Sequence, residues 1–354
     1  MARGARTLLA ALIALGCGEG VRETQGPASD GLVLVRVVDG SKDLMRVRIA
    51  DGSLRPLTRT PDRDESWPYW SGSARRLVFQ AAPRGRPRSI DLMLWDPATG
   101  GETPLTQTPN RTERWPSWSP DGSRLAYVFR QDSSQGVAIA DLQRGTGRVV
   151  AESGRRDSFW RPHFDPDGTR LVAQRGVMRR QSHLWILSAE GAPRPLTADG
   201  AWFDAKAHFA RDGAQVVYSR RPAGGGPHDV ARIAIEGGAI HTLASTPEAD
   251  DHSARPSPSR DEIAFVSNRD GDFDLFLADL SGERLRPLTR TPERDEFAPR
   301  WSPDGERLLV TAIRAGERPR LSNLAELRTV VLDREGRVLL DVPGVMADWM
   351  PPWP

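Results

Sequence analysis

The stretch Pro116-Ser117-Trp118-Ser119-Pro120-Asp121-Gly122 returns as Pro299-Arg300-Trp301-Ser302-Pro303-Asp304-Gly305. Weaker copies keep an aromatic residue at the same point of the phrase. These positions are Trp70, Trp118, Phe164, Phe209, Trp301 and Trp353, with Pro256 in one degraded copy. The intervals between them are 48, 46, 45, 47, 45 and 52 residues. A period of about 45 residues is that of one four-stranded propeller blade.

Each interval contains short apolar runs bounded by turn residues. Leu125–Phe129 and Val137–Leu142 are typical, and a further run often ends in Pro-Leu-Thr, as at 104–106. Such runs predict β-strands joined by tight turns. Pro presets φ in the repeated phrase and Gly relieves the steric cost of reversal, so the phrase itself predicts a hairpin turn. We expect the aromatic residue before it to pack between neighbouring blades.

The two ends of the chain complement each other. Leu32–Val37 has no copy of the phrase before it, whereas Met350–Pro354 is a copy with nothing after it. Paired in space, they would complete one blade and leave no exposed sheet edge. The sequence therefore predicts that residues 31–354 form an all-β, seven-bladed propeller of four-stranded antiparallel blades, closed by pairing of the N- and C-terminal segments in one blade.

The N terminus has the features of an export signal. Two arginines precede the apolar stretch Leu8–Leu15, which is shorter than the roughly 20 residues that span a bilayer. Because Ala14-Leu15-Gly16-Cys17 resembles a bacterial lipobox, residues 1–16 are predicted to be a lipoprotein-type signal peptide and Cys17 the lipidation site. The alternative is ordinary cleavage that leaves a free thiol. Residues 17–30 are polar and predict a flexible tether.

Charge argues against a nucleic-acid partner. Without the two arginines of the leader, the chain has 47 basic and 47 acidic residues. A nucleic-acid-binding protein normally shows a net positive footprint. We therefore expect no nucleic acid among the partners, and membrane contact through the lipid anchor alone.

The repeated Pro-x-Trp-Ser-Pro-Asp-Gly phrase, the Leu-Thr before it and the stretch Ser267–Leu275 resemble the WD40-like (PD40) repeats of the TolB-type propeller family. The resemblance covers about residues 31–354. It implies a cell-envelope protein whose partner is another envelope protein or a peptidoglycan or polysaccharide component. Gly18 after the cysteine lacks the Asp that retains lipoproteins at the inner membrane, so the analogy favours the outer membrane, facing the periplasm.

Acidic residues recur five positions before the repeat aromatic. They are Glu65, Glu113, Asp204, Asp251, Glu296 and, with Trp353 as the last aromatic, Asp348. The first strand of a propeller blade is innermost, so we expect a ring of acids at one mouth of the central channel. Gathered like charges attract cations. These residues are thus candidate ligand or cation sites, for a basic segment or for Ca²⁺; no other cofactor is expected.

A simpler alternative is that each carboxylate caps its own loop or pairs with a nearby arginine. The arginines in reach by sequence are Arg63, Arg111, Arg114, Arg156 and Arg294. His163 and His208 share the position before the aromatic, but other copies carry Tyr69, Ser117, Arg255 and Arg300 there. A zinc site needs a convergent set of ligands, so no metal centre is expected from the two histidines.

No motif of nucleophilic or phosphate chemistry is found in the sequence. We therefore expect a non-catalytic envelope lipoprotein whose propeller is a protein- or cell-wall-binding scaffold, with the ligand at the acid-lined mouth. The alternative is an envelope enzyme of the polysaccharide lyase or hydrolase type. It would use Asp204 or Asp251 with His208 or His252 as general acid or base at the same mouth.

Overall fold

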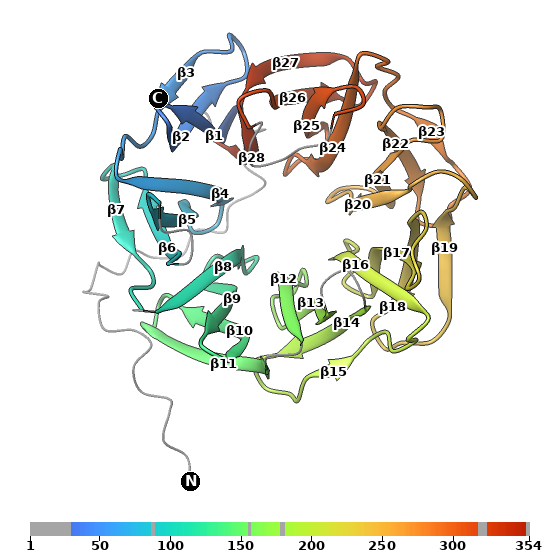
Figure 1. Ribbon diagram of the computed structural model, residues 1–354, viewed down its shortest axis with the longest axis horizontal. Coiled ribbons are helices and arrows are strands. Elements are labelled where there is room, and N and C mark those ends of the chain that lie inside the picture. The colour runs from blue at the N-terminus through green and yellow to red at the C-terminus, as the bar shows by residue number, and fades with distance from the viewer. Residues whose placement is uncertain are drawn as a thin grey trace.

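The regular structure of the described chain consists of β-strands arranged around a common axis (Figure 1). This computed structural model describes residues 30–85, 89–108, 110–154, 157–177, 181–317 and 324–351. The signal peptide expected at 1–16 and Cys17 lie outside these residues, as does nearly all of the expected tether at 17–30. Within the described part, no helical segment has the length and hydrophobicity needed to cross a bilayer.

The two ends of the described chain pair in one sheet, as the sequence predicts. Strand β28 runs antiparallel to β1, with Leu32 opposite Trp349 and Gly31 opposite Met350. The order in this sheet is β28-β1-β2-β3. Its strands are β1 (Gly31–Val38), β2 (Ser41–Arg48), β3 (Leu54–Pro56) and β28 (Val345–Met350).

Four further sheets contain four antiparallel strands each. The first two are β4 (Arg63–Ser71), β5 (Arg76–Pro83), β6 (Asp91–Asp96) and β7 (Gly101–Pro104), then β8 (Arg111–Trp118), β9 (Arg124–Gln131), β10 (Ser134–Asp141) and β11 (Thr146–Ser153). The other two are β20 (His252–Pro256), β21 (Glu262–Ser267), β22 (Asp274–Asp279) and β23 (Arg286–Pro287), then β24 (Arg294–Trp301), β25 (Arg307–Arg314), β26 (Arg328–Asp333) and β27 (Val338–Pro343).

The remaining strands form one sheet of eight. A single parallel contact between β14 and β16, at Ser182 and Phe203, joins two four-strand groups. The strands are β12 (Ser158–Phe164), β13 (Arg170–Val177), β14 (Gln181–Ser188), β15 (Arg194–Pro195), β16 (Trp202–Phe209), β17 (Gln215–Pro222), β18 (Asp229–Ala234) and β19 (Ile240–Ala244). The expectation of seven separate four-stranded blades is therefore wrong. The described strands form five four-stranded sheets and one eight-stranded sheet.

The core lies between neighbouring sheets. One cluster packs Val78 and Leu92 of the β4–β7 sheet against Leu125 and Tyr127 of β9, all of them 1% exposed or less. Middle strands are covered on both faces, which is why their sequences are continuous apolar runs. Removal of this apolar surface from water is the main favourable term that holds the sheets together.

The repeated phrase forms the hairpin turn that its residues predict. Gly122 has φ 69° and donates its backbone N–H to Ser119 O at 2.9 Å. Gly305 repeats this turn with φ 73°. A Cβ on Gly122 would lie 2.5 Å from Ala74 N of the neighbouring sheet. Glycine is required here by both the backbone conformation and the close approach of the next sheet.

Three tryptophans at the repeat position are anchored between adjacent sheets by the indole N–H. Trp118 Nε1 donates to Tyr69 O at 3.0 Å, and Trp301 Nε1 donates to Arg255 O at 2.9 Å. On β28 it is Trp349 that makes this bond, to Arg300 O at 3.2 Å. The assignment of the last copy to Trp353 is therefore wrong: Trp349 fills the repeat position.

Each inner strand contains a β-bulge three residues before the repeat aromatic. The inner strands are β4, β8, β12, β16, β20, β24 and β28 (Figure 1). The bulged residues all have φ between 48° and 58°; they are Trp67, Trp115, Arg161, Lys206, Ser253, Ala298 and Met346. Positive φ is uncommon for residues other than glycine. A bulge at the same place on every inner strand redirects side chains at the same depth of the ring.

We expect Trp349→Ala to lower the free energy of unfolding by about 3–5 kcal/mol, because the indole is 4% exposed and packs between the closing sheet and its neighbour. Urea denaturation measures the change. Val338→Ala, at a position 49% exposed, is the control and should change stability by about 0.5 kcal/mol or less. Equal effects of the two substitutions would contradict the assignment of Trp349.

Candidate functional site on the axis of the ring

The acids expected to line an open mouth are buried in the protein. Glu65, Glu113, Asp204, Asp251 and Glu296 each have 0% of their surface exposed. Each has an arginine partner; the pairs are Arg63–Glu65, Arg111–Glu113, Arg220–Asp204, Arg269–Asp251 and Arg294–Glu296. The structure thus places these carboxylates in separate buried ion pairs, as in the simpler alternative.

Threonine hydroxyls donate hydrogen bonds to most of these carboxylates. In the first, Glu65 accepts hydrogen bonds from the hydroxyls of Thr58 and Thr60, and Thr58 Oγ1 in turn accepts the backbone N–H of Leu44. The Pro-Leu-Thr threonine lies seven residues before the acid here and in the pairs Thr106–Glu113 and Thr289–Glu296. The acid therefore ties an inner strand to the sheet that precedes it.

Burial raises the pKa of these carboxyls. The pKa of Glu113 rises from 4.5 to about 7 because the group is desolvated, although Thr108 and Arg111 oppose the shift. Desolvation also raises the pKa of Glu65, Asp204, Asp251 and Glu296. Buried carboxyls of this kind stabilise contacts between sheets, and they do not present charge to a partner.

Asp348 belongs to a different position of the repeat. Because Trp349 is the repeat aromatic, Asp348 lies one residue before it and not five. Its carboxylate pairs with Arg300 at 2.6 Å and accepts the backbone N–H of Trp70 at 2.8 Å. It therefore connects β24 to β4 across β28, close to the axis.

Two positions of every inner strand turn toward the axis: the bulged residue and the residue before the aromatic. We call these residues the axial ring. They are Trp67, Tyr69, Trp115, Ser117, Arg161, His163, Lys206, His208, Ser253, Arg255, Ala298, Arg300, Met346 and Asp348. Contacts between strands that are not neighbours show the convergence: Arg161 of β12 lies 5.7 Å from the ring of Trp67 on β4.

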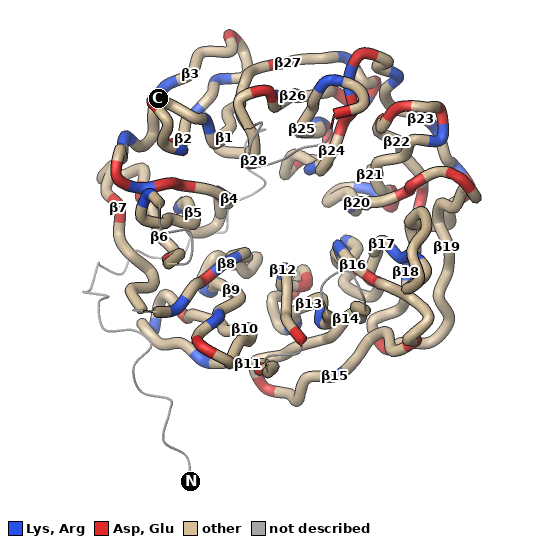
Figure 2. The backbone as a smooth tube through the Cα atoms, in the orientation of Figure 1, with Lys and Arg blue, Asp and Glu red and all other residues tan. Residues whose placement is uncertain are grey.

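The charged members of the axial ring are mainly cations. Arg161, Lys206, Arg255 and Arg300 face one acid, Asp348. Both basic and acidic positions lie along the inner strands in Figure 2. All four cations are partly exposed, although the strands that carry them are the innermost of the ring. The axial ring therefore gathers positive charge near the axis, where burial also lowers the pKa of Lys206 and Arg255.

The two histidines of the axial ring are neutral. His163 and His208 lie with ring centroids 4.2 Å apart, and Arg255 donates to a ring nitrogen of His208. Burial, together with the charge of Arg255, lowers the pKa of both imidazoles well below the ordinary value. Within the described part, no three His, Cys, Asp or Glu side chains are grouped in a way that could hold a metal ion.

Lys206 and Ser253 of the axial ring lie in hydrogen-bond contact. Lys206 Nζ donates to Ser253 Oγ at 2.8 Å, and His252 Nδ1 lies 2.9 Å from the same oxygen. Burial, assisted by the neighbouring Arg161, lowers the pKa of Lys206 to about 8. No sequence motif signals this grouping, because its members come from two repeats.

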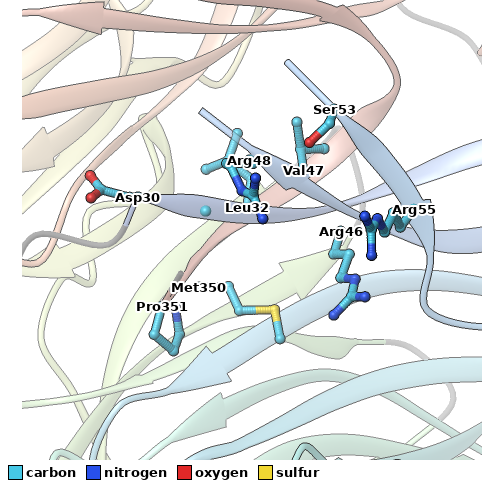
Figure 3. A pocket seen from close by; sticks show the side chains of 10 residues that line it. Asp30, Leu32, Arg46, Val47, Arg48, Ser53, Arg55, Met350 and Pro351 are labelled. Carbon is cyan, nitrogen blue, oxygen red and sulfur yellow. The ribbon is translucent and has the colours of Figure 1, made fainter. Parts of the chain in front are cut away.

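Two pockets lie apart from the axial ring and share no lining residue with it. One is at the closing sheet and is lined by Arg46 of β2 and Arg55 of β3 together with Met350 and Pro351 (Figure 3). The other is lined by residues of β21 and β22 together with Arg334. The second pocket contains carboxylates, but Glu262 is paired with Arg334 and Asp279 with Arg284. We take the axial ring as the candidate site because the inner strands converge there (Figure 1).

Glu113→Gln should flatten the dependence of stability on pH. The pKa of Glu113 is raised in the folded chain, so the protonated carboxyl favours folding. This contribution to the free energy of unfolding is complete below about pH 4.5 and is lost as the pH rises to about 7. The slope should fall by up to about 1.4 kcal/mol per pH unit in this window. Urea denaturation between pH 4 and 8 measures it, with the exposed Glu335→Gln as control. An unchanged slope in Glu113→Gln would refute the assignment.

Solved structures of several proteins share the fold. TolB from Acinetobacter baumannii is 18% identical with a TM-score of 0.55, covering 92% of this chain and 68% of that one. An oligogalacturonate lyase from Vibrio parahaemolyticus is 12% identical with a TM-score of 0.60, covering 80% and 83%. A puromycin hydrolase is 19% identical with a TM-score of 0.69, covering 90% of this chain and 52% of its own length. At these identities the likeness concerns the fold alone.

A comparison with curated proteins gives no match. The family model described as the TolB beta propeller domain matches residues 102–326. This match covers more than half of the chain and agrees with the repeats that the sequence displays. The chain therefore belongs to the TolB β-propeller (PD40) family.

Proposed function

We propose that this chain is a lipoprotein of the bacterial cell envelope that binds an acidic segment of a partner protein at its axial ring. The observation that carries the proposal is the charge of that ring, with four cations facing one acid. The leader sequence supports attachment through Cys17, and the TolB propeller family supports an envelope setting. The outer membrane, facing the periplasm, is the location we propose.

Carboxylates suit the chemistry of this ring. Guanidinium groups bind carboxylates through two parallel hydrogen bonds, and like charges gathered at one place act together on a ligand. Arg255 stands next to neutral His208, and desolvation with the nearby Arg300 lowers the pKa of Arg255. An added negative charge would relieve this crowding of cations.

The sign of the partner's charge is reversed from the sequence-based expectation. That expectation placed a basic segment or Ca²⁺ at an acid-lined mouth. The buried ion pairs leave Glu65, Glu113 and Glu296 with 0% exposure, so an incoming cation would have to displace arginine from each of them. An acidic ligand at the axial ring requires no such displacement.

The alternative function, a polysaccharide lyase or hydrolase that uses Asp204 or Asp251 as acid or base, has less support. Asp204 and Asp251 were its acid–base candidates, and both are fully buried against arginine. The fold of an oligogalacturonate lyase is similar, but its identity of 12% carries no residue role to this chain. Binding is therefore the function that we propose.

The full-length chain should bind a hexaglutamate peptide, with an affinity that falls as salt is added, since salt screens charge. The double variant Arg161→Gln/Arg255→Gln should lose at least about tenfold in affinity because two cations are removed. Isothermal titration calorimetry measures both. The control Arg144→Gln/Arg284→Gln removes the same charge at positions 81% and 89% exposed and should bind as the unchanged chain does. Preference for hexalysine would restore the acidic-mouth hypothesis and overturn this one.

Cys17→Ser should release the chain from the membrane. Cys17 is the single cysteine of the sequence, so no other thiol can replace it. Metabolic labelling with an alkyne-tagged palmitate, followed by membrane fractionation, measures the effect. We expect label and membrane association in the unchanged chain and neither in the variant, because one cysteine carries the whole anchor. Equal membrane association of the two chains would sink the lipoprotein assignment.

A further inference from the structure

Ser253 is held in a backbone conformation that few side chains adopt. It is the bulged residue of β20, with φ 58°, and its backbone N–H donates to Ser219 Oγ at 3.0 Å. Positive φ is uncommon for residues other than glycine, and here it comes from the bulge that every inner strand shares. The bulge directs the Ser253 hydroxyl toward the axis, where the residue remains partly exposed.

Two potential proton acceptors converge on the Ser253 hydroxyl from different strands. Lys206 Nζ on β16 is 2.8 Å from Ser253 Oγ, and His252 Nδ1 on β20 is 2.9 Å from it. Hydrogen-bond contact between a nucleophile and a base is the geometric signature of an activated hydroxyl.

The surroundings of His252 fix the orientation of its ring. Its imidazole is 8% exposed and lies 5.6 Å from the ring of Phe273 and 6.5 Å from that of Phe297. Behind it, His228 Nδ1 is 2.7 Å from Asp250 Oδ1. Burial and the charge of Lys206 lower the pKa of His252 to about 3, which makes it a weak base. Its role is to orient the hydroxyl.

We infer that Ser253 is a nucleophile for acyl esters, with Lys206 as its general base and His252 as a positioning residue. In the acylation step, Ser253 Oγ forms a bond to the carbonyl carbon while neutral Lys206 Nζ takes the hydroxyl proton. The bond from the carbonyl carbon to the leaving oxygen then breaks, and that oxygen takes the proton from Lys206. Water hydrolyses the acyl-serine by the same route. The ring's cations favour the negative charge that develops on the carbonyl oxygen.

Lys206 is suited to this role at mildly alkaline pH. Burial is the main reason that its pKa falls to about 8, and Arg161 from β12 and Arg255 from β20 act in the same direction. Asp250 opposes them, and His252 faces the same oxygen without charge. A general base is most effective when its pKa lies near the working pH.

This activity goes beyond the binding function and does not depend on it. A nucleophilic serine would react with a neutral ester whether or not an acidic peptide binds. The experiment therefore uses an uncharged probe, so that its outcome is independent of the hexaglutamate titration.

The test is labelling of the full-length chain by an alkyl fluorophosphonate, with the modified residue located by peptide mass spectrometry. Ser253 Oγ would bond to phosphorus, fluoride would leave and Lys206 would take the proton. The rate should rise roughly 90-fold from pH 6 to pH 9, as expected for a base with a pKa of about 8. Ser253→Ala should abolish labelling, and Lys206→Met should lower the rate at pH 9 at least tenfold.

Further variants separate the roles of the three side chains. His252→Ala should slow labelling without moving the midpoint of the pH profile, as a positioning residue requires. Ser281→Ala, on an exposed turn, should label as the unchanged chain does. Circular dichroism confirms that each variant is folded. Absence of label from the folded unchanged chain at pH 9, label on other residues only, or a rate independent of pH would each overturn the proposal.

Discussion

The hydrogen-bonded pairing of β28 with β1 holds the ring closed, and the arrangement around the axis depends on it. Without β28, Asp348 could not bridge Arg300 and the backbone of Trp70, and Trp349 could not fill the last wedge. An open array would also expose two sheet edges to other chains. Closure therefore sets the distance across which the inner strands face one another, and with it the composition of the axial ring.

The buried acidic side chains of this protein and the cations of the axial ring lie in different places: the acids between sheets and the cations on the axis. Carboxylates such as Glu113 lie between sheets, where arginine and threonine satisfy them and where they join one sheet to the next. Lys206 and Arg255 lie on the axis and remain partly exposed. A buried pair contributes little attraction to a distant ligand, whereas like charges gathered at a solvent-accessible site act together. The same fold thus uses acids as structural ties and cations as its accessible charge.

The sequence predicts the strands, the hairpin turns and the pairing of the chain ends, because the turn and packing signals recur in most copies. It does not predict the junction of two strand groups, which rests on the one contact between Ser182 and Phe203. It identifies the acidic positions but not their burial, because a carboxylate between sheets and one at an open mouth share the same spacing. The sequence does not identify Trp349 as the last repeat aromatic, because Trp353 is the tryptophan that matches the repeated phrase. The bulged position is occupied by a different residue type in most copies, so the repeat pattern does not predict the contact between Lys206 and Ser253.

The most direct test of the account is the titration of Lys206 by NMR after selective labelling of lysine side chains. The sequence contains lysine only at positions 42 and 206, so Lys206→Met identifies the signal without ambiguity. Burial and the neighbouring cations of the axial ring predict that the signal lost in the variant titrates near pH 8. A Lys206 signal that titrates at the ordinary lysine value, about 10.4, would contradict a crowded, cationic axis.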